Sequence, residues 1–116
     1  MKVMMLILET PEEFDKREPG PAAQAYWDAW KSYSGAVGDK VVGGNILGLA
    51  STAATLRVRN GERQIQDGPY ADSKEALGGY MIFEVDKFDD AIELAAGCPA
   101  AATGAVELRP IVEMQQ

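Results

Sequence analysis

A chain of 116 residues, 47% hydrophobic and 25% charged, has the size and composition of one folded domain, residues 1–116. The formal net charge of −7 disfavours direct nucleic-acid binding, because an acidic surface repels phosphates. The absence of histidine excludes Ser-His and Cys-His nucleophile systems and removes the commonest zinc ligand. No metal and no cofactor are expected. A single cysteine forms no internal disulfide, and no apolar run is long enough for a membrane span. We therefore expect a cytoplasmic protein without membrane association.

The first half of the chain predicts one strand, one helix and then two more strands. Residues 3–9 are short and apolar, as in a buried central strand, and the charged, proline-bearing residues 10–21 predict a loop. Pro21 suits the first turn of a helix that runs to about Val37. Strands are expected at 41–49, interrupted by a bulge or a close backbone approach at Gly43-Gly44, and at 55–59. The helix carries an aromatic stripe, for which core packing is favoured over a pocket wall: Tyr26, Trp30, Tyr33 and Val37.

Asn60-Gly61 predicts a β-hairpin, because a type I′ turn needs positive φ at both central residues. The two-residue turn sets the register, which pairs Leu56 with Ile65 and Ala54 with Asp67. Because side chains alternate along a strand, Asp67 is expected on the same face as these apolar residues, pointing toward the interior.

The second half predicts a short helical turn, a strand, a helix and a last strand. Asp72 and Glu75 have the spacing of a capping box, with the turn ending at Gly78-Gly79 before a strand over 80–85. Asp86 is expected to cap a helix that stops at Gly97 and Pro99. The last strand, 105–113, contains Pro110 and is expected at a sheet edge. This order of elements predicts a ferredoxin-like split βαβ domain of the α+β class.

Residues 67–75, Asp-Gly-Pro-Tyr-Ala-Asp-Ser-Lys-Glu, resemble the Asp-Gly-Pro-Phe signature of the YCII-related family, also called the DGPF-domain family. Gly78-Gly79-Tyr80 and the stretch Glu107-Leu108-Arg109-Pro110 resemble further motifs of that family. The resemblance implies a ferredoxin-like fold paired through its sheets into a dimeric α+β barrel, and hence a homodimer. A histidine–aspartate pair is the active site proposed for some relatives. That mechanism does not carry over intact, because this chain has no histidine.

Asp67 is the candidate catalytic residue. A carboxylate turned into an apolar cleft would exchange a proton with a small substrate. The alternative, favoured by the following Gly-Pro, is an Asx-turn in which the carboxylate accepts backbone N–H groups and holds the loop. Four further residues are candidate ligand-binding groups: Tyr70, Tyr80, Trp30 and Arg109. Their plainer interpretations are ring burial for the two tyrosines, core packing for Trp30, and an ion pair with Glu107 for Arg109.

Two functions remain open from the sequence. The first is an enzyme or binding protein that holds an unknown small molecule near the Asp-Gly-Pro-Tyr loop, with proton transfer assisted by Asp67. The second is a non-catalytic regulatory or protein-interaction module. It follows from a resemblance to proteins encoded near or fused to extracytoplasmic-function sigma factors, and an acidic surface permits docking on a basic protein. A third interpretation gives the signature loop a role in folding and assembly alone.

Overall fold

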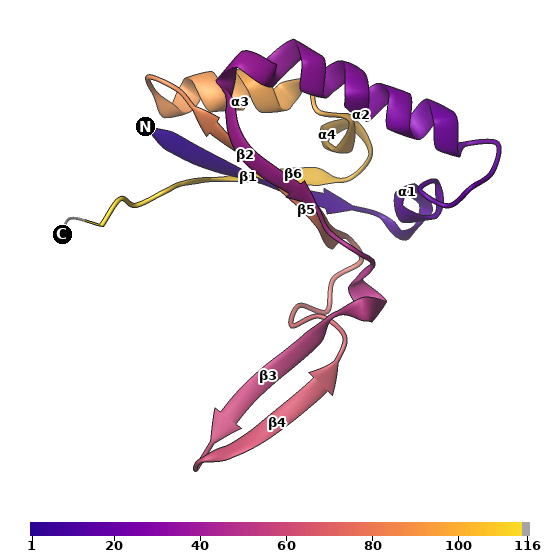
Figure 1. Cartoon of the computed structure of the whole chain (residues 1–116), viewed down its shortest axis with the longest axis vertical. Coiled ribbons are helices and arrows are strands. Elements are labelled where there is room, and N and C mark those ends of the chain that lie inside the picture. Colours follow the sequence, from indigo (N-terminus) through magenta and orange to yellow (C-terminus); the bar gives the residue numbers. More distant parts are fainter. Residues whose placement is uncertain (115–116) are drawn as a thin grey trace.

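The computed structural model describes residues 1–114 and consists of a helix-covered sheet from which a two-stranded hairpin projects (Figure 1). The antiparallel sheet has the order β2-β5-β1-β6, formed by β1 (Lys2–Glu9), β2 (Val41–Ile46), β5 (Ala76–Glu84) and β6 (Ala105–Pro110). The helices are α1 (Pro11–Asp15), α2 (Ala23–Val37), α3 (Phe88–Ala96) and α4 (Pro99–Thr103), with single 3₁₀ turns at Gly38–Lys40 and Ala50–Thr52. The hairpin is formed by β3 (Ala54–Arg59) and β4 (Glu62–Asp67).

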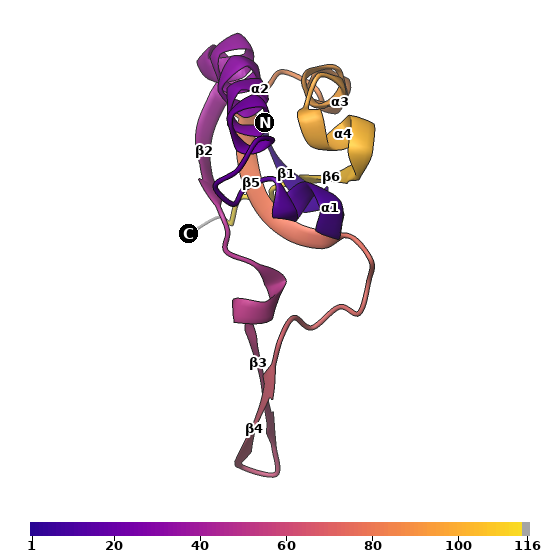
Figure 2. The ribbon, with the colours of Figure 1, turned by 90° about the vertical axis from the view of Figure 1, so that its right-hand side faces the viewer.

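The chain order β1-α2-β2-β5-α3-β6 and the strand order confirm the ferredoxin-like α+β fold. Helices α2, α3 and α4 lie on one face of the sheet (Figure 2). Strand β1 is central, and its alternate residues Val3, Met5 and Ile7 are buried beneath these helices. None of the helices in residues 1–114 is both long and apolar enough to cross a membrane.

Helix α2 confirms the predicted core stripe, since Tyr26, Tyr33 and Val37 are buried and Trp30 is half-buried. The predicted loop over residues 10–21 is wrong in part, because it contains α1. Thr10 caps this helix by accepting the Glu13 backbone N–H at 3.3 Å, and Pro11 stands at its first position. A helix of five residues has too few positions to show a helical period, and the three prolines of residues 10–21 favoured the loop interpretation.

The predicted capping box at Asp72 and Glu75 is wrong: no helical turn forms there, and β5 begins already at Ala76. The Ser73 hydroxyl donates to the Glu75 carbonyl and shapes a bend instead. Gly78 and Gly79 are buried inside the strand, where Gly79 pairs with Ile7 of β1 and Ile46 of β2, and Gly78 falls at a shift in the register with β1. Gly79 therefore allows close packing between neighbouring strands, and neither glycine ends a helix.

Several boundaries also differ from those predicted. The cap of α3 is Lys87 instead of Asp86, β2 ends at Ile46, and β6 ends at Pro110. Two predictions about the sheet edges are confirmed. A register shift between Val41 and Gly43 marks a bulge in β2, and β6 is an edge strand.

The hairpin has the predicted register, with Leu56 opposite Ile65 and Ala54 opposite Asp67. Asn60 and Gly61 have φ of 52° and 77°, as a type I′ turn requires. The predicted placement of its apolar face is wrong, however. The hairpin leaves the body on the side away from the helices (Figure 1), and Leu56 and Ile65 are 57% and 69% exposed. Alternation fixes which residues share a face, but it does not say what covers that face.

Candidate functional site

A pocket of about 570 Å³ lies between α2 and the adjoining strands β2 and β5. Trp27 and Trp30 line it from α2, and Ile7 and Glu9 line it from β1. Four glycines line the strand side: Gly43, Gly44, Gly78 and Gly79. Because these glycines have no side chains, the strand side of the pocket is formed by bare backbone at these positions. The pocket is therefore mostly apolar, with charged groups concentrated at one end, which is the usual construction of a small-molecule site.

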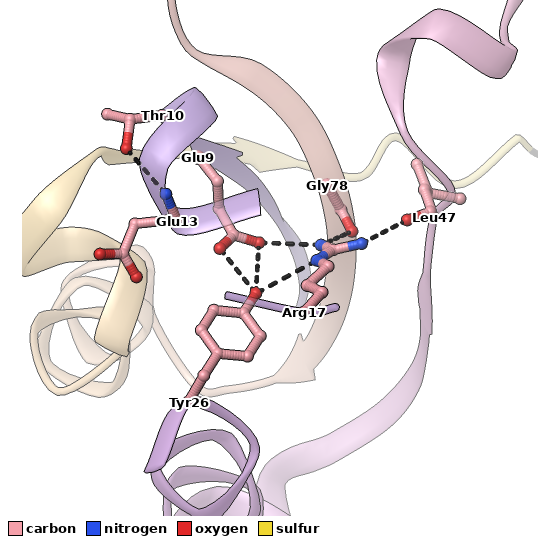
Figure 3. A network of polar contacts seen from close by, with 7 residues as sticks. All are labelled: Glu9, Thr10, Glu13, Arg17, Tyr26, Leu47 and Gly78. Carbon is pink, nitrogen blue, oxygen red and sulfur yellow. Dashed lines mark hydrogen bonds and ion pairs between the residues drawn. The ribbon is translucent and has the colours of Figure 1, made fainter. Parts of the chain in front are cut away.

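The charged end is built around Glu9, which is only 2% exposed (Figure 3). The Tyr26 hydroxyl lies 2.6 Å from Glu9 Oε2 and 2.9 Å from Oε1, so its single proton is shared between them. Arg17 Nη2 donates to Oε1 at 2.8 Å and forms an ion pair with the carboxylate. A buried carboxylate is stable only with such partners, and Glu9 has both a cation and a phenol.

Arg17 connects three separate parts of the chain. Its Nη1 donates to the Leu47 carbonyl at 2.7 Å, and its Nη2 also donates to the Gly78 carbonyl at 2.9 Å. The guanidinium lies over the Phe14 ring, with Cζ 4.6 Å from the centroid. Burial opposes the charge, but the hydrogen bonds with Glu9 and Tyr26 outweigh it and raise the pKa of Arg17. Arg17 is thus a fixed, permanent cation.

Tyr26 stays a neutral phenol at ordinary pH, because burial and the neighbouring Glu9 carboxylate raise its pKa to about 12. Its hydroxyl also accepts a hydrogen bond from Arg17 Nε at 3.3 Å. Its ring packs edge-on against Trp27, with centroids 4.9 Å apart. The phenol therefore links the ion pair to the aromatic wall of the pocket.

Gly78 is required where the ion pair meets β5. A Cβ there would lie 2.7 Å from Arg17 Nη2, 2.9 Å from Glu9 Oε1 and 3.0 Å from the Phe14 ring. Gly44 is restricted in the same way, since its Cβ would lie 2.8 Å from the Tyr80 carbonyl. Gly78 of the sequence motif therefore leaves the room that the Glu9–Arg17 pair occupies.

The candidate residues from the sequence fall into two groups. Trp30 and Tyr80 border the pocket, and the Tyr80 hydroxyl accepts a hydrogen bond from Asn45 Nδ2 at 2.8 Å. Asp67, Tyr70 and Arg109 do not line it. Tyr70 is 79% exposed and lies beside Arg57, and Arg109 pairs with Glu107 on the opposite edge strand, β6.

Asp67 is exposed at the end of β4, so the predicted position in an apolar cleft is wrong within this chain. The alternative Asx-turn is not formed either, since no residue in 1–114 donates a hydrogen bond to its carboxylate. The loop is instead held by backbone and hydroxyl contacts: Gly68 N–H donates to the Ala53 carbonyl, and Thr55 donates to the Gly68 carbonyl. A role of Asp67 in proton transfer stays a prediction.

Sequence reasoning missed Glu9 and Arg17. Glu9 continues the two-residue alternation of Val3, Met5 and Ile7, so it belongs to the buried face of β1, and a carboxylate there needs a partner. That signal was available in the sequence. Arg17 has no comparable signal, because its position depends on how the segment after α1 folds back over the sheet. Among residues 1–114, no cluster of three or more acidic or cysteine side chains is placed to hold a metal ion.

The fold and the pocket define a ferredoxin-like α+β domain with a ligand-sized hollow beside a buried ion pair. A family model described as the YCII-related domain matches residues 1–115. The chain therefore belongs to the YCII-related family.

Two individual proteins give further comparisons. An uncharacterized protein, R00369, of Rhizobium meliloti (strain 1021) is 38% identical over 63 residues, which cover 53% of this chain and 51% of that protein. The chain thus matches about half the length of this curated relative. Among solved structures, 5-chloro-2-hydroxyhydroquinone dehydrochlorinase from Burkholderia phenoliruptrix AC1100, in complex with 2,5-dihydroxybenzoquinone, is similar with a TM-score of 0.57. The match covers 98% of this chain and 96% of the neighbour at 15% identity, so it shows a shared fold.

Proposed function

We propose that this protein binds a small organic molecule with a planar, largely apolar body and at least one hydroxyl group, in the pocket between α2 and strands β2 and β5. The observation that carries the proposal is a buried ion pair, Glu9–Arg17, at the end of an aromatic and glycine-lined pocket. A carboxylate and a guanidinium in that position orient a polar group, while the apolar walls bind the body of the ligand.

The unused hydrogen-bonding capacity of the pair indicates the ligand's polar group. A guanidinium has five N–H donors, and Arg17 uses four of them, on Glu9, Tyr26, Leu47 and Gly78. One donor is left for a ligand oxygen. A carboxylate accepts about four hydrogen bonds, so Glu9 also retains acceptor capacity. A ligand hydroxyl both donates and accepts, and it suits this end of the pocket.

The planar body follows from the walls. Trp27 and Trp30 provide flat rings on the helix side, and glycines provide bare backbone on the strand side. Aromatic rings favour offset-stacked or edge-to-face contacts with such surfaces. The ligand in the structural neighbour, 2,5-dihydroxybenzoquinone, is a small molecule of this general kind, although the shared fold does not transfer that neighbour's reaction.

The test is calorimetric titration with small hydroxylated aromatic rings and with the same rings lacking the hydroxyl. We expect binding to the hydroxylated compounds that weakens at least about tenfold in Glu9→Gln, because the charge of an acceptor contributes more than a neutral hydrogen bond. Trp30→Leu should weaken both series. Asp67→Asn is the matched control, since it makes the same change of group outside the pocket. Unchanged affinity in Glu9→Gln with loss in Asp67→Asn would return the site to the Asp-Gly-Pro-Tyr loop and reject this proposal.

A protein-interaction role is the second candidate, and one observation favours it. The hairpin carries large apolar side chains that are more than half exposed, and such surfaces commonly mark interfaces between proteins.

A further inference from the structure

Three charged side chains line the pocket beside α2, and only two of them neutralise each other. Glu9 and Arg17 form the buried ion pair at one end. The third, Lys31, makes no ion pair with any carboxylate of residues 1–114. The formal charge of the lining side chains is therefore +1, in a chain whose net charge is −7. A pocket of this sign attracts an anion that the acidic surface of the whole chain repels.

Lys31 lies away from the ion pair, further along the helical wall of the pocket. Tyr26, which contacts Glu9, marks the ion-pair end of α2. Lys31 follows Tyr26 by five residues, so its Cα lies about 7.5 Å further along the helix axis. It shares the pocket-lining face of α2 with Trp27, one turn before it, and Ser34, one turn after it. The pocket thus has the ion pair at one end, indole rings between, and a lysine with a serine at the other end.

The two ends differ in their contact with water. Lys31 and Ser34 are exposed, whereas Glu9 is only 2% exposed, so the lysine end is the mouth of the pocket. An anion bound at the mouth keeps part of its hydration, and its desolvation costs less than burial beside Glu9 would. An anion at the buried end would also face the Glu9 carboxylate, which repels it. Both effects place the anionic group of a ligand at Lys31 and not at Arg17.

The lysine end suits a carboxylate better than a phosphate. A lysine ammonium is a point charge with three N–H donors, and a serine hydroxyl supplies one more donor. A carboxylate carries one negative charge, which Lys31 alone balances. A phosphate ester carries about −1.5 to −2 at neutral pH, so part of its charge would remain without a partner.

We propose that Lys31 selects ligands that carry a carboxylate, so that the pocket holds an aromatic ring with a hydroxyl group at the Glu9–Arg17 pair and a carboxylate at Lys31. This inference rests on the proposed function, because it assigns the second polar group of the same ligand. Two substituents in para positions on one ring point in opposite directions, as the two ends of the pocket require. The flexible stem of the lysine adjusts its reach to the length of the ligand.

The experiment is calorimetric titration of the full chain with para-hydroxybenzoate and with para-hydroxybenzamide, which has the same ring and hydroxyl but no charge. The wild type should bind the acid at least about fivefold more tightly than the amide, as expected for one charged contact at a partly exposed site. Lys31→Met keeps a long side chain without the charge, so the ratio of the two affinities should fall to about one. Lys31→Arg keeps the charge and should restore most of the preference for the acid.

Lys87→Met is the matched control. It removes the charge of another exposed lysine, at the N-cap of α3 and outside the pocket, and should keep the wild-type ratio. Because Lys31 and Lys87 are exposed, near-ultraviolet circular dichroism should show unchanged packing in every variant. Salt gives a second readout: sodium chloride should weaken binding of the acid and leave binding of the amide nearly unchanged, because it screens exposed charge pairs.

The outcomes separate this inference from the function on which it rests. If Lys31 only keeps α2 soluble, acid and amide bind the wild type equally; the inference is then wrong, and the proposed function stands. Retention of the preference for the acid in Lys31→Met would overturn it as well. So would tighter binding of the acid in Glu9→Gln, which would place the carboxylate beside Arg17. Binding of neither compound to the wild type would reject the proposed function and this inference together.

Discussion

Replacement of Glu9 by leucine tests whether the buried ion pair holds the pocket together. The change leaves the Arg17 charge, whose side chain is 12% exposed, and the Tyr26 hydroxyl without their common acceptor. Removing one partner of a buried pair costs about 3–5 kcal/mol of the free energy of unfolding. The double variant Glu9→Leu, Arg17→Met removes both charges. The Gly78 carbonyl then still accepts the Leu47 N–H. The Tyr26 hydroxyl lacks its acceptor in both variants, and the double variant in addition leaves the Leu47 carbonyl without its arginine donor, which costs about 1–3 kcal/mol.

We therefore expect the double variant to be more stable than the Glu9→Leu single variant. Urea unfolding followed by tryptophan fluorescence measures this, since both tryptophans of the chain line the pocket. The control is Glu107→Leu, which breaks an ion pair whose arginine is 72% exposed and should change stability by less than about 1 kcal/mol. The reasoning would be refuted if Glu9→Leu lowered the free energy of unfolding no more than Glu107→Leu does. It would also be refuted if the double variant lost the sum of what Glu9→Leu and Arg17→Met lose separately.

Three further predictions concern single residues. Gly78→Ala should lower the free energy of unfolding by about 1–3 kcal/mol, because the added Cβ would overlap the ion pair. The control is Gly35→Ala in α2, whose Cβ meets no atom within 4 Å, so this variant should be as stable as wild type or more stable. Urea unfolding measures both. The pKa of Tyr26 is about 12 in the folded protein against an ordinary 10.0, because the folded state favours the neutral phenol. The stability that Tyr26 gives the folded state is therefore complete below pH 10 and is lost as pH rises toward 12. Wild type should therefore lose on the order of 2 kcal/mol more than Tyr26→Phe over that range, and parallel pH profiles would contradict it. Cys98 is only 2% exposed, and burial raises the pKa of its thiol. A thiol-specific reagent should therefore react with Cys98 only after unfolding. Fast reaction of the native protein would contradict this prediction.

The local patterns of the sequence predicted most of the fold. The Asn60-Gly61 turn determined the hairpin register, and the helical spacing of Tyr26, Tyr33 and Val37 determined the buried side of α2. These features depend on neighbours in sequence, and elementary backbone geometry is enough to derive them. The capping-box interpretation of Asp72 and Glu75 was wrong for the complementary reason: pairing of β5 with β1 and β2 outweighs a local helix signal.

The candidate site was less predictable because it is assembled from distant segments. Glu9, Arg17 and the Gly78 carbonyl meet only after the chain crosses the sheet, and no spacing in the sequence links them. The family signature drew attention to Asp67, but the hairpin carries that residue away from the pocket. Alternation put Asp67 on the correct face of the correct strand. Which surface that face meets depends on tertiary and intermolecular packing, which a local pattern does not contain.

The two edges of the four-stranded sheet bear on how the protein resists aggregation. Edge strands expose backbone groups that recruit strands from other molecules into fibrils. Here one edge strand, β2, is distorted by its bulge between Val41 and Gly43, and the other, β6, ends at Pro110, which has no N–H to donate. Both edges are therefore poor templates for strand addition.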